Sequence, residues 1–281
     1  IKREERNMSK KINAKMGKGL LLSTIMVLSF NLVACLETTA NTVKVAPESV
    51  KQKSVAVASI RKTIYTDQEL WVAGLKEKQL KQPAFAFVNT DPSLPNVLLM
   101  GGAISVGYTH AVREELADIA NVYRIPANGG DTKSALKNLQ KWLAGTQWEV
   151  IHFNWGMNDL KRKKKTESDA TTPHRVVLDQ YASNLDQIVT QLEKSAESLI
   201  WASTTIIPDS AKSRISGDEI LYNRAALEVM ENHPTVKIDD LFSLSKDHPG
   251  DRKPKSVSFS KEGQKRQGVQ VASSIKSALD K

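Results

Sequence analysis

The chain has 281 residues, 40% of them hydrophobic, and a formal net charge of +9 at pH 7. This length and apolar content can bury a sizeable core, which excludes a wholly disordered chain and predicts one domain with appendages. Residues 1–34 carry seven of the 40 Lys and Arg residues and two of the 31 Asp and Glu residues. The rest of the chain has 33 basic and 29 acidic residues, a net charge of +4, so nucleic-acid binding is not indicated.

Residues 1–35 predict a leader for export. Four lysines between residues 8 and 19 form a basic segment, and an apolar run follows over residues 20–30. This order is typical of a secretory signal, and the run is shorter than the ~20 residues that a membrane-spanning helix needs. Either Met8 or Met16 can start such a leader.

Cys35 ends the leader in the sequence Leu-Val-Ala-Cys, which resembles the lipobox of bacterial lipoproteins. In that box the cysteine receives a lipid and becomes the mature N-terminus. Cys35 is the only cysteine of the chain, so it cannot form a disulfide within it, and lipidation explains a lone cysteine at this position. The sequence therefore predicts a protein anchored by lipid in the bacterial cell envelope, with the outer membrane among the candidate membranes.

A tether and a short helical segment are expected next. Residues 36–65 are mainly small, polar and basic, and we expect them to form a flexible tether. Residues 66–90 should form a helix and a connection, because residues 66–69 resemble a capping box and apolar residues follow at near-helical spacing. The helix is predicted over residues 66–82, and Pro92 and Pro95 then break the chain.

Residues 91–281 alternate between strand and helix patterns. Short apolar runs predict five strands, over residues 97–100, 121–125, 150–154, 199–203 and 236–238. Helices are predicted over residues 108–119, 132–143, 180–194, 218–230 and 261–279. Strands that alternate with helices favour a parallel sheet covered on both faces, which is a three-layer α/β/α domain of the flavodoxin-like kind.

The first of these strands leads directly into Gly101, Gly102, Ala103, Ile104 and Ser105. A strand that ends in a glycine turn and opens a helix is where open α/β sheets place their ligands. The stretch resembles the first block of the SGNH (GDSL-type) hydrolases, Gly-Asp-Ser-Ile-Ser, in which the first serine is the nucleophile. Ala103 stands at the position of that serine, and Gly102 stands at the position of the aspartate.

The other three blocks of this family also have counterparts in the chain. Gly130 matches the glycine whose N–H points into the oxyanion hole, and residues 156–159 read Gly-Met-Asn-Asp, which matches the family's Gly-x-Asn-Asp. In the family the asparagine, here Asn158, donates to the oxyanion. The family's Asp-x-x-His block supplies the acid and the base of the triad, and here Lys255 and Ser258 stand at those positions.

The resemblance thus implies an esterase fold without its catalytic triad. In such a triad the histidine takes the proton of the serine hydroxyl, while the aspartate orients the imidazole. Alanine has no nucleophile, and serine cannot act as a base near neutral pH. We therefore expect a protein without catalysis that binds an ester, a carbonyl group or an acetylated glycan at Ala103, Gly130 and Asn158, and we expect no cofactor or metal.

Two other interpretations stay open. An active carbohydrate esterase or acylhydrolase could use relocated residues, namely Ser105 and His248, the latter with Asp247 or Asp251 beside it. We expect Ser105 to lie in the first turn of the following helix and to point away from the site. A scaffold of the cell envelope without a small ligand is the third interpretation.

Several further residues near the blocks could contact a ligand. The basic run over residues 161–165 could line the rim of the site and hold an acidic glycan through its charge. Trp155 and Tyr108 could stack on a sugar ring, although packing in the core is the more common role of such residues. His152 is expected to be a buried structural histidine rather than a base.

Overall fold

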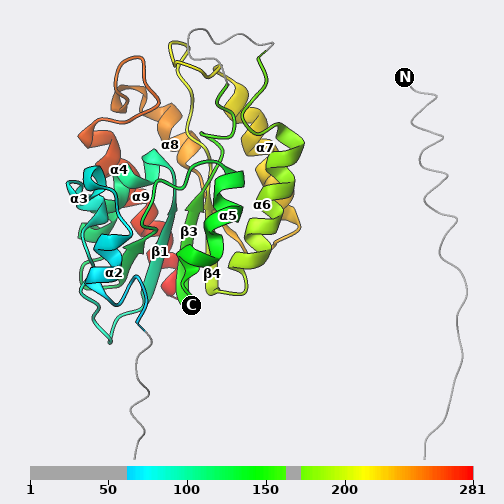
Figure 1. The fold of residues 1–281 in the computed structure, drawn as a ribbon. Helices are drawn as coiled ribbons and strands as arrows, with labels where there is room; N and C mark the ends of the chain where they lie inside the picture. The colour runs from blue at the N-terminus through cyan, green and yellow to red at the C-terminus, as the bar shows by residue number, and fades with distance from the viewer. Residues whose placement is uncertain (1–61, 163–171, 281) are drawn as a thin grey trace, which may run out of the picture. The chain divides into compact units, whose positions relative to one another are not determined.

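The structure is a computed structural model that describes residues 62–162 and 172–280 (Figure 1). The leader, Cys35 and the tether up to residue 61 lie outside these residues, so their predictions are not tested by the fold. Within the described ranges, no helix is both long enough and apolar enough to cross a membrane.

The five predicted strands form one parallel sheet in the order β2-β1-β3-β4-β5. Their bounds are β1 (Asn96–Gly101), β2 (Asn121–Arg124), β3 (Trp148–Asn154), β4 (Ala196–Ala202) and β5 (Lys237–Asp239). The chain leaves β1 toward β2 on one side and later continues from β3 on the other side, so the strand order reverses between β1 and β3. Open α/β sheets bind ligands where the order reverses, in the crevice beyond the carboxyl ends of the strands.

Helices cover both faces of the sheet, as predicted (Figure 1). The helices α4 (Ala103–Glu115) and α9 (Lys261–Leu279) pack on one face, and α5 (Thr132–Leu143), α6 (Leu178–Leu192) and α7 (Asp218–Glu231) pack on the other. Val97 and Leu99 of β1 belong to the core between the sheet and α4 and α9. Leu98 and Met100 belong to the core between the sheet and α5, α6 and α7. Because strand side chains alternate between faces, a strand buried on both sides needs such an unbroken apolar run.

The single helix predicted over residues 66–82 is wrong. The structure has two short helices, α2 (Gln68–Ala73) and α3 (Glu77–Leu80), followed by the 3-10 turn η1 (Pro83–Phe85). Gly74 ends α2, and its N–H donates to the carbonyl groups of Leu70 and Trp71. A glycine near the end of a helical pattern is a common stop signal, and the apolar spacing alone did not reveal it.

This N-terminal segment packs beside β2, the edge strand of the sheet. The ring of Tyr65 lies edge-on to Tyr123 of β2 at 5.6 Å and to Trp148 of β3 at 5.0 Å, and its hydroxyl donates to the carbonyl of Trp142. Tyr65 is only 3% exposed, so the last residues of the predicted tether belong to the folded part. Covering an edge strand in this way limits pairing with other chains.

Two further helices differ from the prediction. The helix α4 begins at Ala103, five residues earlier than predicted, so the glycine turn after β1 is only one residue long. The helix α8 (Leu241–Asp247) and the turn η2 (Pro249–Asp251) were not predicted. Asp240 caps α8 through the N–H of Ser243, but the helix is too short to show an apolar period.

Candidate functional site

A pocket of about 180 Å³ lies at the carboxyl ends of β1 and β3. Four of the five residues singled out by the family blocks line it, namely Ala103, Gly130, Asn158 and Ser258. They come from positions up to 155 residues apart in the chain. The parallel sheet brings Ala103, Gly130 and Asn158 together because each follows a strand whose carboxyl end meets the same edge, whereas Ser258 lies on the loop before α9.

The turn after β1 leads to Ala103, which the resemblance places at the position of the family's nucleophile. Ala103 is the first residue of α4, so its N–H has no acceptor within the helix and can donate to a ligand. Gly102 before it has φ −82° and ψ −155°, an extended conformation that any residue can adopt. A Cβ atom at this position would lie 3.0 Å from Nδ2 of Asn158, so the glycine leaves that amide uncovered on this side.

Asn158 is held close to the second family position. Its Nδ2 donates to the carbonyl of Gly130 at 3.1 Å, and because an amide group has two hydrogens, one remains for a ligand. Gly156 starts the loop with φ +139°, and a Cβ atom there would lie 2.3 Å from Oγ1 of Thr204. A glycine is therefore required at this position, both for the backbone conformation and for space.

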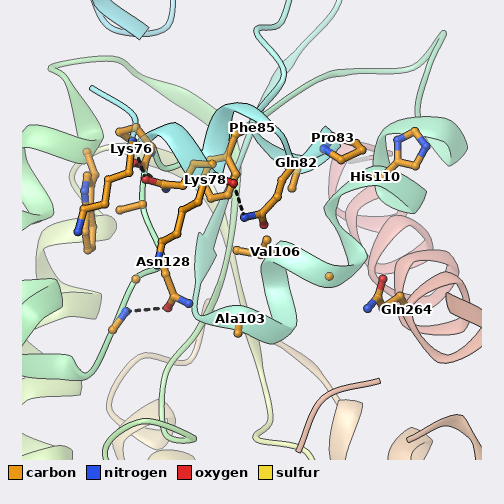
Figure 2. Close-up of a pocket in the computed structure, with 18 of the residues that line it drawn as sticks. Lys76, Lys78, Gln82, Pro83, Phe85, Ala103, Val106, His110, Asn128 and Gln264 are labelled. Atoms are coloured by element: carbon orange, nitrogen blue, oxygen red, sulfur yellow. Dashed lines mark hydrogen bonds between the residues drawn. The ribbon is translucent and has the colours of Figure 1, made fainter. Parts of the chain in front are cut away.

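The N–H of Gly130 differs from what the resemblance implies. It donates to Oδ1 of Asn128 at 3.4 Å, a long hydrogen bond, while the residue itself has φ +66°. Asn128 is exposed, and Figure 2 shows its side chain in a larger groove that adjoins this pocket. A bound carbonyl would have to displace this side chain before it could accept from Gly130. No pattern in the sequence indicates this role for Asn128.

The last family block is only partly at the pocket. Ser258 lies on the loop between η2 and α9, where its carbonyl accepts from the N–H of Lys253 at 2.9 Å. Lys255 lies at the exposed tip of this loop with φ +53°, and it is not among the residues that line the pocket. The structure thus brings the base position to the site but not the acid position.

The side chains of the pocket favour a negatively charged or strongly polarised ligand. Among its described lining residues, Arg214 and Lys253 are the only ionisable ones, and there is no His, Cys, Asp or Glu. Arg214 Nε donates to the carbonyl of Met157 at 2.9 Å. Burial lowers the pKa of Arg214 to about 10, so it still carries its charge at neutral pH. Fixed positive charge and N–H donors stabilise an oxyanion or an anion.

Gln267 of α9 also lines the pocket and was missed by the sequence analysis. It is 2% exposed, and neither Nε2 nor Oε1 has a hydrogen-bond partner among the described residues. An unpaired buried amide costs about 1–3 kcal/mol, so a polar group of a ligand or a water is expected to satisfy it. The only signal in the sequence was a glutamine in the buried stripe of α9, four residues before Val271.

Asp159 fastens the loop that carries Asn158. It is fully buried, and its Oδ1 accepts from the N–H of Thr132 at 2.8 Å and from Oγ1 of the same residue at 2.6 Å. Its Oδ2 has no hydrogen-bond partner within the described part of the chain. Burial raises the pKa of Asp159 to about 6, against its usual 3.8. The carboxyl group thus ties the loop after β3 to the start of α5.

The structure does not bring the alternative catalytic pair to the pocket. Ser105 lies in the first turn of α4, as predicted, and its Oγ donates to the carbonyl of Gly102 at 2.9 Å. Neither Ser105 nor His248 is among the residues that line the pocket. Asp251, one of the carboxylates considered for His248, instead accepts from Nε of Arg266 at 2.7 Å.

Most of the remaining candidates are structural. Tyr108 and Trp155 are buried in the two cores, although Trp155 also lines the pocket. His152 is buried with its Nε2 3.0 Å from Oδ2 of Asp239. In the basic run, Arg162 is buried in an ion pair with Asp218 rather than placed at the rim, and residues 163–165 lie outside the described residues. The described residues contain no group of His, Cys, Asp and Glu that could hold a metal ion.

A much larger groove of about 1050 Å³ adjoins the pocket (Figure 2). The two share the lining residues Ala103, Gly107, Gly130 and Gln264. Its other walls come from α3 and η1, from α4, from α5 and the loop before it, and from the start of α9. No pattern in the sequence predicted that the N-terminal segment takes part in the site.

Known structures resemble this arrangement, although no protein-family model and no curated protein sequence matches the chain. The lipase/acylhydrolase from Enterococcus faecalis matches with a TM-score of 0.53 and 18% identity, over 66% of this chain and 96% of its own. The acetyl xylan esterase AlAXEase matches with a TM-score of 0.52 and 14% identity, over 64% of this chain and 99% of its own. The chain has the SGNH hydrolase fold.

Structures of a second acetylxylan esterase, including mutants of it, also match the chain. The acetylxylan esterase Axe2 from Geobacillus stearothermophilus matches with a TM-score of 0.52 and 14% identity, over 64% of this chain and 94% of its own. Matching structures include catalytic mutants of Axe2 in which a serine, an aspartate or a histidine is changed to alanine. In the present chain, Ser258 is the only residue of these three types among the described lining residues of the pocket.

Proposed function

We propose that this chain is a non-catalytic SGNH-fold protein that binds an ester, a carbonyl group or an acetylated glycan in the former esterase pocket. We further propose that it is exported and held in the bacterial cell envelope by a lipid on Cys35. One observation carries the proposal of binding without cleavage. Donors remain at Ala103 and Asn158, whereas histidine, cysteine and carboxylate side chains are missing from the described lining of the pocket.

The retained groups are suited to a polarised oxygen. A carbonyl oxygen can accept from the N–H of Ala103 and from Nδ2 of Asn158, while Arg214 and Lys253 add positive charge. The unpaired amide of Gln267 offers a further donor and acceptor at the pocket wall. A volume of about 180 Å³ is below the range of roughly 300–1,000 Å³ that is usual for drug-sized ligands, which suits a short acyl group.

Binding of an acetylated sugar tests this proposal. The full chain, solubilised in detergent, is titrated by calorimetry with monoacetylated xylobiose and with the same sugar without its acetyl group. We expect the acetylated sugar to bind more tightly, and Asn158→Ala to weaken that binding about fivefold to tenfold, since one hydrogen bond is worth ~1 kcal/mol. Asn232→Ala, at an exposed position after α7, is the matched control. Equal binding of the two sugars would exclude an acyl-binding pocket.

The anchor is tested separately by Cys35→Ala. The variant is expected to move from the membrane fraction to the soluble fraction of the envelope, because it lacks the thiol that would carry the lipid. Asn31→Ala, four residues earlier in the leader, keeps the cysteine and should leave the protein with the membrane. Fractionation followed by immunoblotting measures both. Retention of Cys35→Ala in the membrane fraction would show that another part of the chain provides the anchor.

A further inference from the structure

The large groove beside the pocket has a strong excess of positive charge. Five lysines line it, namely Lys76, Lys78, Lys141, Lys261 and Lys265. Among its described lining residues Glu114 is the one carboxylate, and its Oε1 lies 3.4 Å from Nε2 of His110. None of the ion pairs found in the described ranges joins one of the five lysines to a carboxylate. We call this cavity the lysine groove.

The five lysines come from three separate elements. Lys76 and Lys78 lie at α3, Lys141 at the end of α5, and Lys261 and Lys265 at the start of α9. All five are exposed, so the core does not require them, and Figure 2 shows Lys76 and Lys78 extending into the groove from the N-terminal segment. Like charges gathered in one concave surface repel one another but attract and concentrate an anion. The ligand of the groove should therefore be negatively charged.

The other side chains of the lysine groove favour a sugar over a nucleic acid. Five amide side chains line it, namely Gln79, Gln82, Asn128, Asn138 and Gln264. An amide can both donate and accept, which matches the hydroxyl groups of a sugar. Proteins that bind single-stranded nucleic acids stack bases on open aromatic faces. Here Phe85 and Trp142 are only 4% and 5% exposed, so they offer no such face.

We propose that the lysine groove binds a negatively charged glycan chain and that an acyl substituent of this chain enters the pocket beside Asn158. The groove and the pocket share Ala103, Gly107, Gly130 and Gln264, so one ligand can occupy both. The volume of about 1050 Å³ lies at the top of the roughly 300–1,000 Å³ range of small-ligand sites, which suits several sugar units. The part of the inference that concerns the acyl group rests on the proposed function, whereas the binding of the charged chain does not.

A matched pair of ligands tests the charge. The full chain in detergent is titrated with a hexamer of α-1,4-linked galacturonic acid, and with the same hexamer in its methyl-esterified form, which is uncharged. We expect the charged hexamer to bind at least tenfold more tightly at low ionic strength. We also expect this preference to shrink at 0.5 M salt, because salt screens exposed charges. Equal affinity for the two hexamers would overturn the inference, as would tighter binding of a single-stranded DNA 12-mer.

Two triple variants with the same net charge identify the surface. Lys76→Gln, Lys78→Gln and Lys141→Gln together remove groove lysines and should weaken binding of the charged hexamer about tenfold, since each exposed ion pair contributes a modest amount. Lys133→Gln, Lys137→Gln and Lys246→Gln remove three exposed lysines that do not line the groove. This control should bind like the unmodified chain. A similar loss in both variants would show that general charge, not the groove, attracts the glycan.

A comparison of ligands separates this inference from the proposed function. If the lysine groove holds the chain, the triple variant of Lys76, Lys78 and Lys141 should weaken binding of the unacetylated galacturonate hexamer, whereas Asn158→Ala should reduce the preference for an acetylated sugar over the same sugar without its acetyl group. Hexamer binding that depends on the lysines but not on acetylation would support the groove and refute the acyl-binding pocket. Acetyl-dependent binding without any preference for charge would refute the groove and leave the proposed function standing.

Discussion

The unmodified protein is expected to hydrolyse neither short acyl esters nor acetylated sugars above the background rate. In a serine protease, loss of the nucleophile or the base alone lowers kcat by about 10⁶-fold. The resemblance to the family places Ala103 at the nucleophile position and Ser258 at the base position, and Lys255, which it places at the acid position, does not line the pocket. Release of acetate over many hours, measured against a reaction without protein, checks this expectation. Heat-inactivated protein provides a second negative control.

Restoring the triad is expected to return weak turnover. The triple change Ala103→Ser, Lys255→Asp and Ser258→His supplies all three groups to a site that keeps the N–H of residue 103 and Asn158. The gain should be small because Lys255 lies at an exposed turn with φ +53°, away from the pocket, so a carboxylate there would orient the new histidine poorly. Ala103→Ser alone should remain inactive, since nucleophile and base act as a unit.

Robust turnover by the unmodified chain would contradict the proposal of binding without cleavage. If Ser105→Ala and His248→Ala then abolished it, those two residues would form a relocated catalytic pair. This result would also require a structural change, because the Oγ of Ser105 now donates to the carbonyl of Gly102 and neither residue lines the pocket. Turnover that survived both changes would mean that the family blocks are wrongly aligned.

The sheet could be predicted because a buried parallel strand can be recognised from its own residues. A parallel strand buried on both faces needs an unbroken apolar run, and residues 97–100 have one, with no polar position to suggest an alternative. The N-terminal segment was harder, because Leu70, Trp71 and Leu75 fit one helix as well as they fit two. The break at Gly74 and the burial of Tyr65 depend on packing against β2 and β3, which local spacing does not encode.

The candidate site was predictable where a residue directly follows a strand. Ala103 and Asn158 meet because β1 and β3 are parallel neighbours, so the end of each strand fixes the position of the next residues. Asn128, Gln267 and the lysine groove were not predictable in this way. Gln267 looks like one polar residue on an ordinary helix until α9 packs against the pocket, and the five lysines are scattered until three separate elements surround one cavity.

Asp159→Asn is expected to change how stability depends on pH. Burial raises the pKa of Asp159 from its usual 3.8 to about 6, so between these values the folded chain keeps a proton that the unfolded chain has released. The free energy of unfolding therefore falls as the pH rises through this window, and the contribution from Asp159 is present at low pH and lost above pH 6. The variant cannot ionise at this position, so its free energy of unfolding should not show this fall with rising pH.

Urea unfolding at pH 4.5, 5.5, 6.5 and 7.5 measures the effect. The free energy of unfolding of Asp159→Asn, relative to the unmodified chain, should rise by about 2 kcal/mol from pH 4.5 to pH 7.5. Asparagine can still accept from the N–H and Oγ1 of Thr132 through its Oδ1, so the tie between the loop after β3 and α5 is kept. Asp118→Asn, at an exposed position after α4, corrects for the general effect of removing a negative charge. A difference that stays constant over this range would show that folding does not raise the pKa of Asp159, and a difference that falls would show that the folded chain stabilises the ionised carboxylate.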